Sequence, residues 1–182
     1  MALTARERGW HTLVPLAFAA LAAACSESQQ TTAPEKFFTA DTPRYTAGSG
    51  LAGPLLGRGT IPDGFKLKRK NGKWEIDINA KDPTDVAVQS LTFQPGGQSG
   101  WHSHPGPVVM IITSGTVTFY EADDPSCTPV VKTAGQVFVE SGEHSHLGRN
   151  QTGTIATAIA TVYAPPGAAL RIDEPASGNC SF

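Results

Sequence analysis

Short stretches in which apolar and polar residues alternate recur along most of the chain. Residues 65–70 and 74–78 both follow this pattern, and the dipeptide Asn71-Gly72 lies between them. Alternation is typical of a β-strand with one buried face, and Asn-Gly favours a two-residue hairpin turn. The pattern therefore predicts a β-hairpin here, and further strands over residues 85–93, 108–113, 116–121, 136–140, 144–147, 154–163 and 169–172.

One of these runs, residues 154–163, contains alanines that would also suit a helix. Its β-branched residues and the stop at Pro165-Pro166-Gly167 favour a strand instead. The 19 glycines and 14 prolines of the chain likewise favour short strands joined by tight turns. About eight or nine strands without a helix predict an all-β domain, a sandwich or barrel of the jelly-roll kind.

The first 24 residues differ from the rest. Arg6 and Arg8 stand near the start, and an apolar run over residues 13–24 follows them, which is the layout of a secretory signal peptide. This run is shorter than the roughly 20 residues that a membrane-spanning helix needs. We therefore expect an exported chain in which residues 1–24 take no part in the fold. The 182 residues suffice for one ordinary domain and are too few for two.

The segment that ends at Cys25 resembles the lipobox of bacterial lipoproteins, with Ala22 at the position where leucine is more usual. The resemblance implies a lipid on Cys25 and a membrane-anchored protein. The alternative is simple cleavage after Ala24, which would give a periplasmic or secreted protein. Residues 25–58 are rich in Thr, Ala, Gly, Ser and Pro without periodicity, so we expect a flexible tether there and the barrel domain over residues 59–182.

The charge balance argues against nucleic-acid binding. The chain carries 14 basic and 16 acidic residues, and loss of residues 1–24 would leave 12 and 15. The one basic cluster, residues 66–70, alternates with apolar residues as the solvated side of a strand does. We expect no nucleic-acid partner, and contact with a membrane only through the N-terminal lipid.

Two cysteines remain within the predicted domain, Cys127 and Cys180. An exported protein folds in an oxidising compartment, where such a pair persists as a disulfide. This bond would connect the C-terminal tail to the middle of the domain. The alternative is two separate buried thiols.

Four of the five histidines form two His-x-His pairs, His102 with His104 and His144 with His146, while His11 lies in the signal segment. A spacing of two on an extended chain places both rings of a pair on one face. Neutral imidazole is a common ligand of zinc, iron, copper and nickel. If the barrel brings the two pairs together, they predict a metal site.

The spacing around these histidines resembles the two motifs of the cupin superfamily, and in particular its small, single-domain, quercetin-dioxygenase-like members. The positions that match the first motif are Gly96, His102, His104 and Gly115, and those that match the second are Gly135, His146 and Asn150. The resemblance covers about residues 85–172 and implies a single cupin jelly-roll β-barrel.

Two departures from the motifs bear on the site. Where the first motif has a glutamate ligand, this chain has Val108, or Val109 with the longer spacing, and neither can bind a metal. The Pro-x-Gly of the second motif is replaced by Ser141-Gly142-Glu143. The resemblance therefore implies a metal site that lacks its usual carboxylate.

Carried over residue by residue, the resemblance implies a divalent metal ion (Fe, Zn, Cu, Ni or Mn) on His102, His104 and His146. His144 is an extra candidate, since on a regular strand it would face the same way as His146. Glu140 and Glu143 are candidate substitutes for the missing carboxylate, although Glu143 is expected to be solvated. No residue is assigned a catalytic role from the sequence.

Two functions fit this expectation. Three-histidine cupins include dioxygenases, so the resemblance implies a metal-dependent dioxygenase acting on a small chelating substrate. The alternative is a non-catalytic module at the cell surface that binds a metal ion or small ligand, because fold does not identify a reaction. The resemblance also suggests a homodimer.

Overall fold

The computed structural model describes residues 45–182, and every regular element in this part of the chain is a β-strand. The all-β expectation is therefore confirmed. The strands are β1 (Ser49–Ala52), β2 (Leu55–Ile61), β3 (Phe65–Asn71), β4 (Trp74–Ala80), β5 (Thr84–Gln98), β6 (His102–Ser103), β7 (Val108–Ser114), β8 (Thr116–Glu121), β9 (Val130–Thr133), β10 (Val137–Glu140), β11 (His146–Arg149), β12 (Ala156–Ala164) and β13 (Ile172–Asp173).

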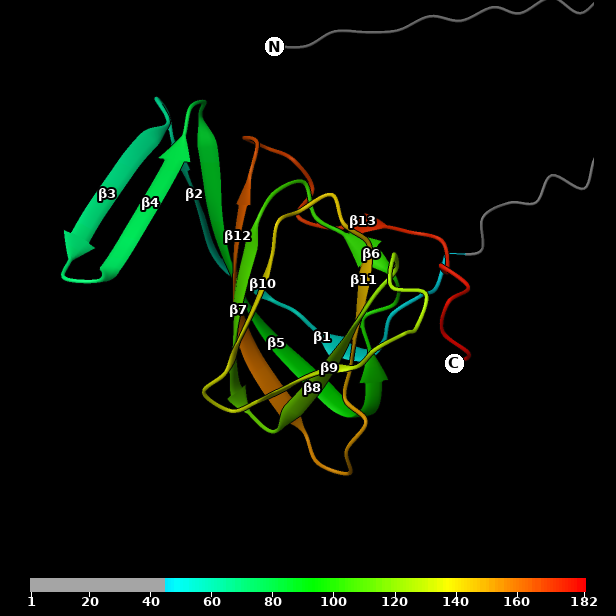
Figure 1. Cartoon of the computed structure of the whole chain (residues 1–182). Coiled ribbons are helices and arrows are strands. Elements are labelled where there is room, and N and C mark those ends of the chain that lie inside the picture. The colour runs from blue at the N-terminus through cyan, green and yellow to red at the C-terminus, as the bar shows by residue number, and fades with distance from the viewer. Residues whose placement is uncertain (1–44) are drawn as a thin grey trace, which may run out of the picture. The chain divides into compact units, whose positions relative to one another are not determined.

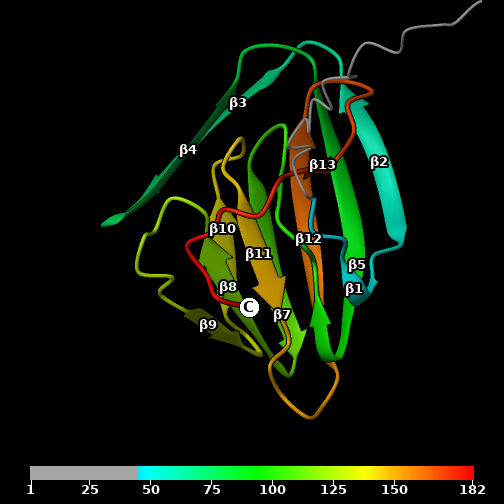
Figure 2. The same cartoon turned by 90° about the vertical axis from the view of Figure 1, so that its right-hand side faces the viewer.

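Eleven strands form one sheet that curls into a nearly closed barrel (Figures 1 and 2). Its main path runs β10-β7-β12-β5-β11-β6-β13, and β8 joins it by pairing with β11. The 15-residue strand β5 is long enough to pair with β12, β11, β1 and β2. Because β6, β10 and β11 belong to one curved sheet, residues distant in the sequence reach the same interior.

The interior follows from the alternation along each strand. In β12 every second residue is buried, so four alanines and Val162 face inward, which confirms residues 154–163 as a strand region. In β7 the inward residues are Val108, Met110 and Ile112. The small alanines of β12 leave room for larger rings elsewhere, and Phe119 and Phe138 stack there with centroids 3.9 Å apart.

The barrel begins earlier in the chain than the sequence analysis expects. Residues 49–58, assigned above to the tether, form β1 and most of β2, and both strands pair with β5. Glycines hide this part of the pattern, because they carry no side chain to reveal an inward or outward face. Gly50, with φ of 60°, marks the register shift between Ser49 and Leu51.

The hairpin predicted around Asn71-Gly72 is present as β3 and β4, paired from Phe65 opposite Ala80 to Asn71 opposite Trp74. These two strands form a separate sheet and do not extend the barrel. Figure 1 shows the hairpin projecting away from the barrel wall. Leu67 and Trp74 are each 57% exposed on it, so the alternation here marks a face that no other described strand covers.

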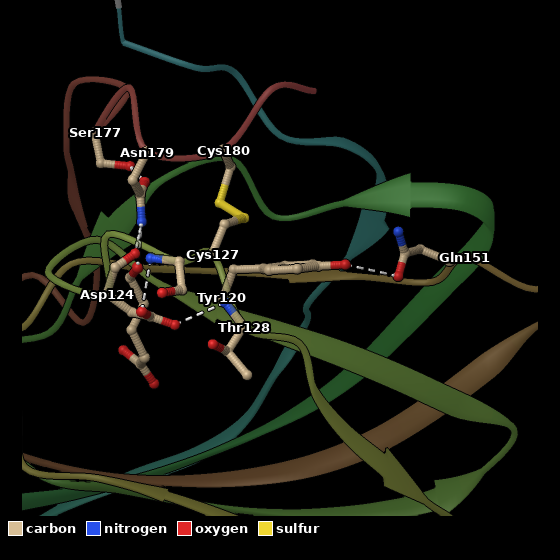
Figure 3. Close-up of a disulfide and its surroundings, with 10 residues drawn as sticks. Tyr120, Asp124, Cys127, Thr128, Gln151, Ser177, Asn179 and Cys180 are labelled. Carbon is tan, nitrogen blue, oxygen red and sulfur yellow. Dashed lines mark hydrogen bonds between the residues drawn. A yellow bond between two sulfur atoms is a disulfide. The ribbon is translucent and has the colours of Figure 1, made fainter.

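A smaller core lies beside the C-terminal tail and contains the disulfide. Cys127 and Cys180 are bonded, with Cα atoms 5.3 Å apart, which is compatible with the expected pairing (Figure 3). Trp101, Tyr120 and Leu147 are buried beside them. Asn179 donates hydrogen bonds to the carbonyls of Glu121 and Asp124, so the tail is also held by polar contacts.

The expected signal peptide, Cys25 and the tether up to residue 44 lie outside the described residues. Within the described part, no helix is long and apolar enough to cross a membrane.

Candidate metal centre

Three histidines meet inside the barrel. His102 lies in β6, His104 follows two residues later, and His146 is the first residue of β11. His146 is the register partner of His102, since β11 and β6 are antiparallel neighbours. The ring centroids lie 4.2 to 5.4 Å apart, and the three rings offer donor atoms within 4.8 Å of one another. The predicted trio is thus brought together.

Each of these rings has a backbone carbonyl within hydrogen-bond distance of Nδ1, and in His146 the Glu140 carboxylate lies closer still, at 2.8 Å. The Nδ1 atoms of His102, His104 and His146 lie 2.9, 2.5 and 3.2 Å from the carbonyl oxygens of Gly100, Leu170 and His144. A proton on Nδ1 that is donated to a carbonyl leaves the Nε2 lone pair available. This is the arrangement by which proteins fix the tautomer of metal-binding histidines.

Burial keeps the first pair neutral. His102 and His104 are 7% and 8% exposed. Loss of hydration, reinforced by the neighbouring ring of His146, lowers the pKa of His102 to about 2. Desolvation also lowers the pKa of His104, against the opposing effect of Glu140. Both imidazoles are therefore uncharged near pH 7, which is the form that binds metal ions.

A carboxylate stands next to the trio. Glu140, the last residue of β10, has an Oε1 3.4 Å from Nε2 of His104 and an Oε2 2.8 Å from Nδ1 of His146. Its side chain is 5% exposed, yet neither oxygen accepts a well-oriented hydrogen bond from any described residue. Of the two candidate carboxylates, Glu140 is the one that the fold places at the cluster.

His144 and Glu143 lie outside the cluster. The expectation that His144 faces the same way as His146 is wrong, because β11 begins only at His146 and a turn with Glu143 at φ 54° precedes it. The His144 ring is 40% exposed and lies between Glu121 and Asp123, at 2.9 and 2.8 Å. The hydrogen bond to Asp123 is the main reason why the pKa of His144 is raised.

Asn150, the last motif residue, has a structural role. It is completely buried, and its amide donates to the carbonyls of Phe93 and Thr154, while its oxygen accepts from the backbone and hydroxyl of Thr152. It therefore closes the loop between β11 and β12. Trp101, whose place the sequence leaves open, is 3% exposed and belongs to the smaller core.

The three histidines line a pocket of about 440 Å³. Much of the wall is apolar, and its members include Leu51, Leu91, Phe93, Met110, Phe119 and Val162. Leu51 belongs to β1, so the segment expected to be tether forms part of this wall. The pocket therefore offers the histidines a largely apolar chamber big enough for a small molecule.

One cationic residue of the pocket was missed from the sequence. Arg171 lines it and donates hydrogen bonds to the carbonyl of Ser99 and to the Asp173 carboxylate. Its positive charge contributes to the low pKa values of His102 and His104, so it lies within electrostatic reach of both. No motif marks an isolated arginine just before the two-residue strand β13, and only the fold reveals its position.

The donor set fits a divalent metal ion. Three imidazoles that converge in this way are typical of catalytic sites for zinc and of sites for iron, copper and nickel. The buried carboxylate beside them is costly to leave without a partner, and a cation would supply one. His102, His104 and His146 are the residues that would hold the ion.

Comparison with known proteins agrees with the fold and the cluster. Residues 89–163 match the family model described as Cupin domain, and all three histidines and Glu140 fall within this span. The match thus covers the part of the barrel that carries the histidine cluster.

The individual relatives are distant or partial. Over 38 residues the chain is 47% identical to an (R)-mandelonitrile lyase from Granulicella tundricola. These 38 residues make up 21% of this chain and 29% of the lyase. The chain thus spans less than a third of that relative. Among solved structures, an oxalate oxidase is 23% identical with a TM-score of 0.38, over 42% of this chain and 40% of the oxidase. The polyketide cyclase RemF from Streptomyces resistomycificus is 11% identical with a TM-score of 0.47, over 71% and 75%.

Proposed function

We propose that this chain is an exported cupin that binds a divalent metal ion on His102, His104 and His146 and acts on a small chelating molecule, as a dioxygenase when the ion is iron. The observation that carries the proposal is the convergence of three buried imidazoles, each with Nδ1 at a backbone carbonyl, on a pocket of about 440 Å³. A structural metal site has no need of such a chamber, whereas a catalytic site keeps positions open to a substrate.

The pocket supports a substrate class. Its apolar wall suits a compact hydrocarbon body, and its volume limits the molecule to a small one. Arg171 adds a cation, which favours an anionic or strongly polar end that can also reach the histidines. We infer a small molecule with adjacent oxygen donors, such as a diketone or a hydroxy acid.

The chain's own residues then have separate tasks. A bound ion would supply Lewis acidity and, as iron, reactivity towards dioxygen. The three histidines would hold it through Nε2, with the Nδ1 atoms of His102 and His104 at carbonyls and that of His146 facing both the His144 carbonyl and the Glu140 carboxylate. Arg171 would orient the anionic end of the substrate, and the apolar wall would keep bulk water from the site.

A second candidate is a lyase that cleaves a cyanohydrin. It is favoured by the local likeness to the (R)-mandelonitrile lyase, which covers 38 residues at 47% identity. The apolar wall, with Phe93 and Phe119, would accept an aromatic ring.

The test begins with metal analysis of the purified protein and of a variant with both His102→Ala and His104→Ala. Near-stoichiometric iron, copper, nickel, zinc or manganese that is lost in the variant supports the site. The loaded protein is then screened with small diketones, hydroxy acids and (R)-mandelonitrile, with oxygen uptake and release of cyanide as separate readouts. Ligand-dependent stabilisation without turnover would favour the non-catalytic binding module. Absence of metal even after reloading would remove the proposal.

The location and assembly of the protein are part of the same proposal. Lipidation of Cys25 would hold the barrel at a membrane, and Cys25→Ser should then release the protein into the soluble fraction.

A homodimer would explain the apolar face of the β3–β4 hairpin, since an isolated two-stranded hairpin is only marginally stable in water. Sedimentation of the wild-type protein and of Leu67→Ser would test this, with a monomer in both cases counting against the dimer.

A further inference from the structure

Glu140 is the buried polar group that a site of three histidines leaves unexplained. Its side chain is 5% exposed and both carboxylate oxygens lack a well-oriented hydrogen bond within the described residues. Burying a carboxylate without a partner costs several kcal/mol, so such groups are normally paired or bound to a metal.

The distance between Glu140 and His104 is that of two ligands on one ion. For ligand bonds of about 2.1 Å and a tetrahedral angle, two donor atoms are separated by about 3.4 Å. Oε1 of Glu140 lies 3.4 Å from Nε2 of His104. The other oxygen lies 2.8 Å from Nδ1 of His146, so the carboxylate is between two rings of the cluster.

The strand register explains how the carboxylate reaches this place. Glu140 of β10 is paired with Val108 of β7, and both side chains are buried. Partners across an antiparallel pair have Cβ atoms about 5 Å apart on the same face of the sheet. The carboxylate therefore enters the barrel next to the position at which this chain has a valine that cannot bind metal.

We propose that Glu140 is the fourth protein ligand of the metal, supplied by β10 to His102 of β6, His104 just after it and His146 of β11. This inference rests on the proposed metal binding. It changes the chemistry of the site, since a carboxylate lowers the net charge with a divalent ion from +2 to +1. An oxygen ligand also favours harder ions such as Mn²⁺ and Fe²⁺ over softer ones.

The test compares Glu140→Gln with the matched control Glu143→Gln, which makes the same chemical change on an exposed side chain three residues away. Affinity for Co²⁺ and Mn²⁺ is measured by competition with a chromophoric chelator, and the visible spectrum of the Co²⁺ form reports its coordination. We expect Glu140→Gln to weaken binding at least 10-fold and to change the spectrum, while Glu143→Gln changes neither.

A second readout separates a ligand from a structural residue. In the metal-free protein, Glu140→Gln removes a buried charge, so its melting temperature should equal or exceed that of the wild type. A structural ion pair with the histidines would give the opposite sign, and a lower melting temperature with unchanged metal affinity would overturn the inference.

A third measurement uses only the wild-type protein, so misfolding of a variant cannot affect its result. Infrared difference spectra between metal-free and Mn²⁺-loaded protein should show the shift of a carboxylate stretch, and absence of that shift would overturn the role of Glu140. If wild-type protein binds neither of these ions, nor iron, copper, nickel or zinc, the proposed function fails as a whole. If it binds both and Glu140→Gln behaves as Glu143→Gln does, only the fourth ligand is lost.

Discussion

The two His-x-His pairs have the same sequence pattern but different structures. His102 and His104 are both buried, whereas in the second pair His146 enters the barrel and His144 remains at the rim between Glu121 and Asp123. Desolvation lowers the pKa of His102, and acidic neighbours raise that of His144. A spacing of two in the sequence is thus not enough by itself to place both rings in the same site.

The largest expected effect separates the two members of the second pair. His146→Ala removes a ring from the cluster and should weaken metal binding about 1,000-fold, or roughly 4 kcal/mol. His144→Ala removes a rim residue and should leave the affinity within about twofold. A competition titration with a chromophoric chelator measures both, and loss of metal in His144→Ala would contradict the contrast between the pairs.

Removal of the disulfide should lower the stability of the protein but leave metal binding at the histidine cluster nearly unchanged. Replacing Cys127 and Cys180 by serine should lower the free energy of unfolding by about 2–4 kcal/mol, because the unfolded chain loses a crosslink. The bond lies in the smaller core, whose tail residue Asn179 holds the carbonyl of Glu121. Chemical denaturation gives the loss of stability, and the same chelator titration should show metal affinity within a few-fold of the wild type. A loss of metal as large as that in His146→Ala would show that the two regions are not independent.

The metal-free protein should lose stability as the pH falls. The pKa of His102 is about 2 in the folded state. Below about pH 6.5, His102 is therefore protonated in the unfolded chain but not in the folded one. The free energy of unfolding is highest above that pH, and below it each buried histidine with such a low pKa lowers it by up to about 1.4 kcal/mol per pH unit. Melting curves of wild type and His102→Gln between pH 7.5 and 5 test this, and parallel curves would show that the ring does not matter.

His144, at the rim, should affect the pH dependence of stability in the opposite direction, and this effect should be the smallest of those predicted here. The pKa of His144 is raised, so its ion pairs with Asp123 and Glu121 contribute below its unfolded pKa of about 6.5 and are lost as the pH rises through the higher folded value. The exposed location limits the contribution to less than about 1 kcal/mol. The difference in melting temperature between wild type and His144→Gln should therefore shrink from pH 6 to pH 9. A difference that grows over this range would contradict the pairing.

Much of the barrel and the three-histidine cluster could be predicted from the sequence, because alternation and motif spacing are local signals. The position of His144 could not, since a turn at Gly142 and Glu143 shifts the start of β11. Nor could the approach of Glu140, which depends on the pairing of β10 with β7. Arg171 was missed for the same reason, as only the closed sheet brings it to the pocket.

The pairing of His102 with His146 has a consequence for folding. An ion held by both rings would act as a reversible crosslink that closes the long chain segment between β6 and β11. Such a closure removes loop entropy from partly unfolded states, so metal would slow the separation of these strands as well as stabilise the end state. The loaded barrel should therefore unfold as one unit, whereas the metal-free protein should open first where β6 meets β11. Delivery of metal would then decide how long the chain survives proteolysis, independently of any reaction in its pocket.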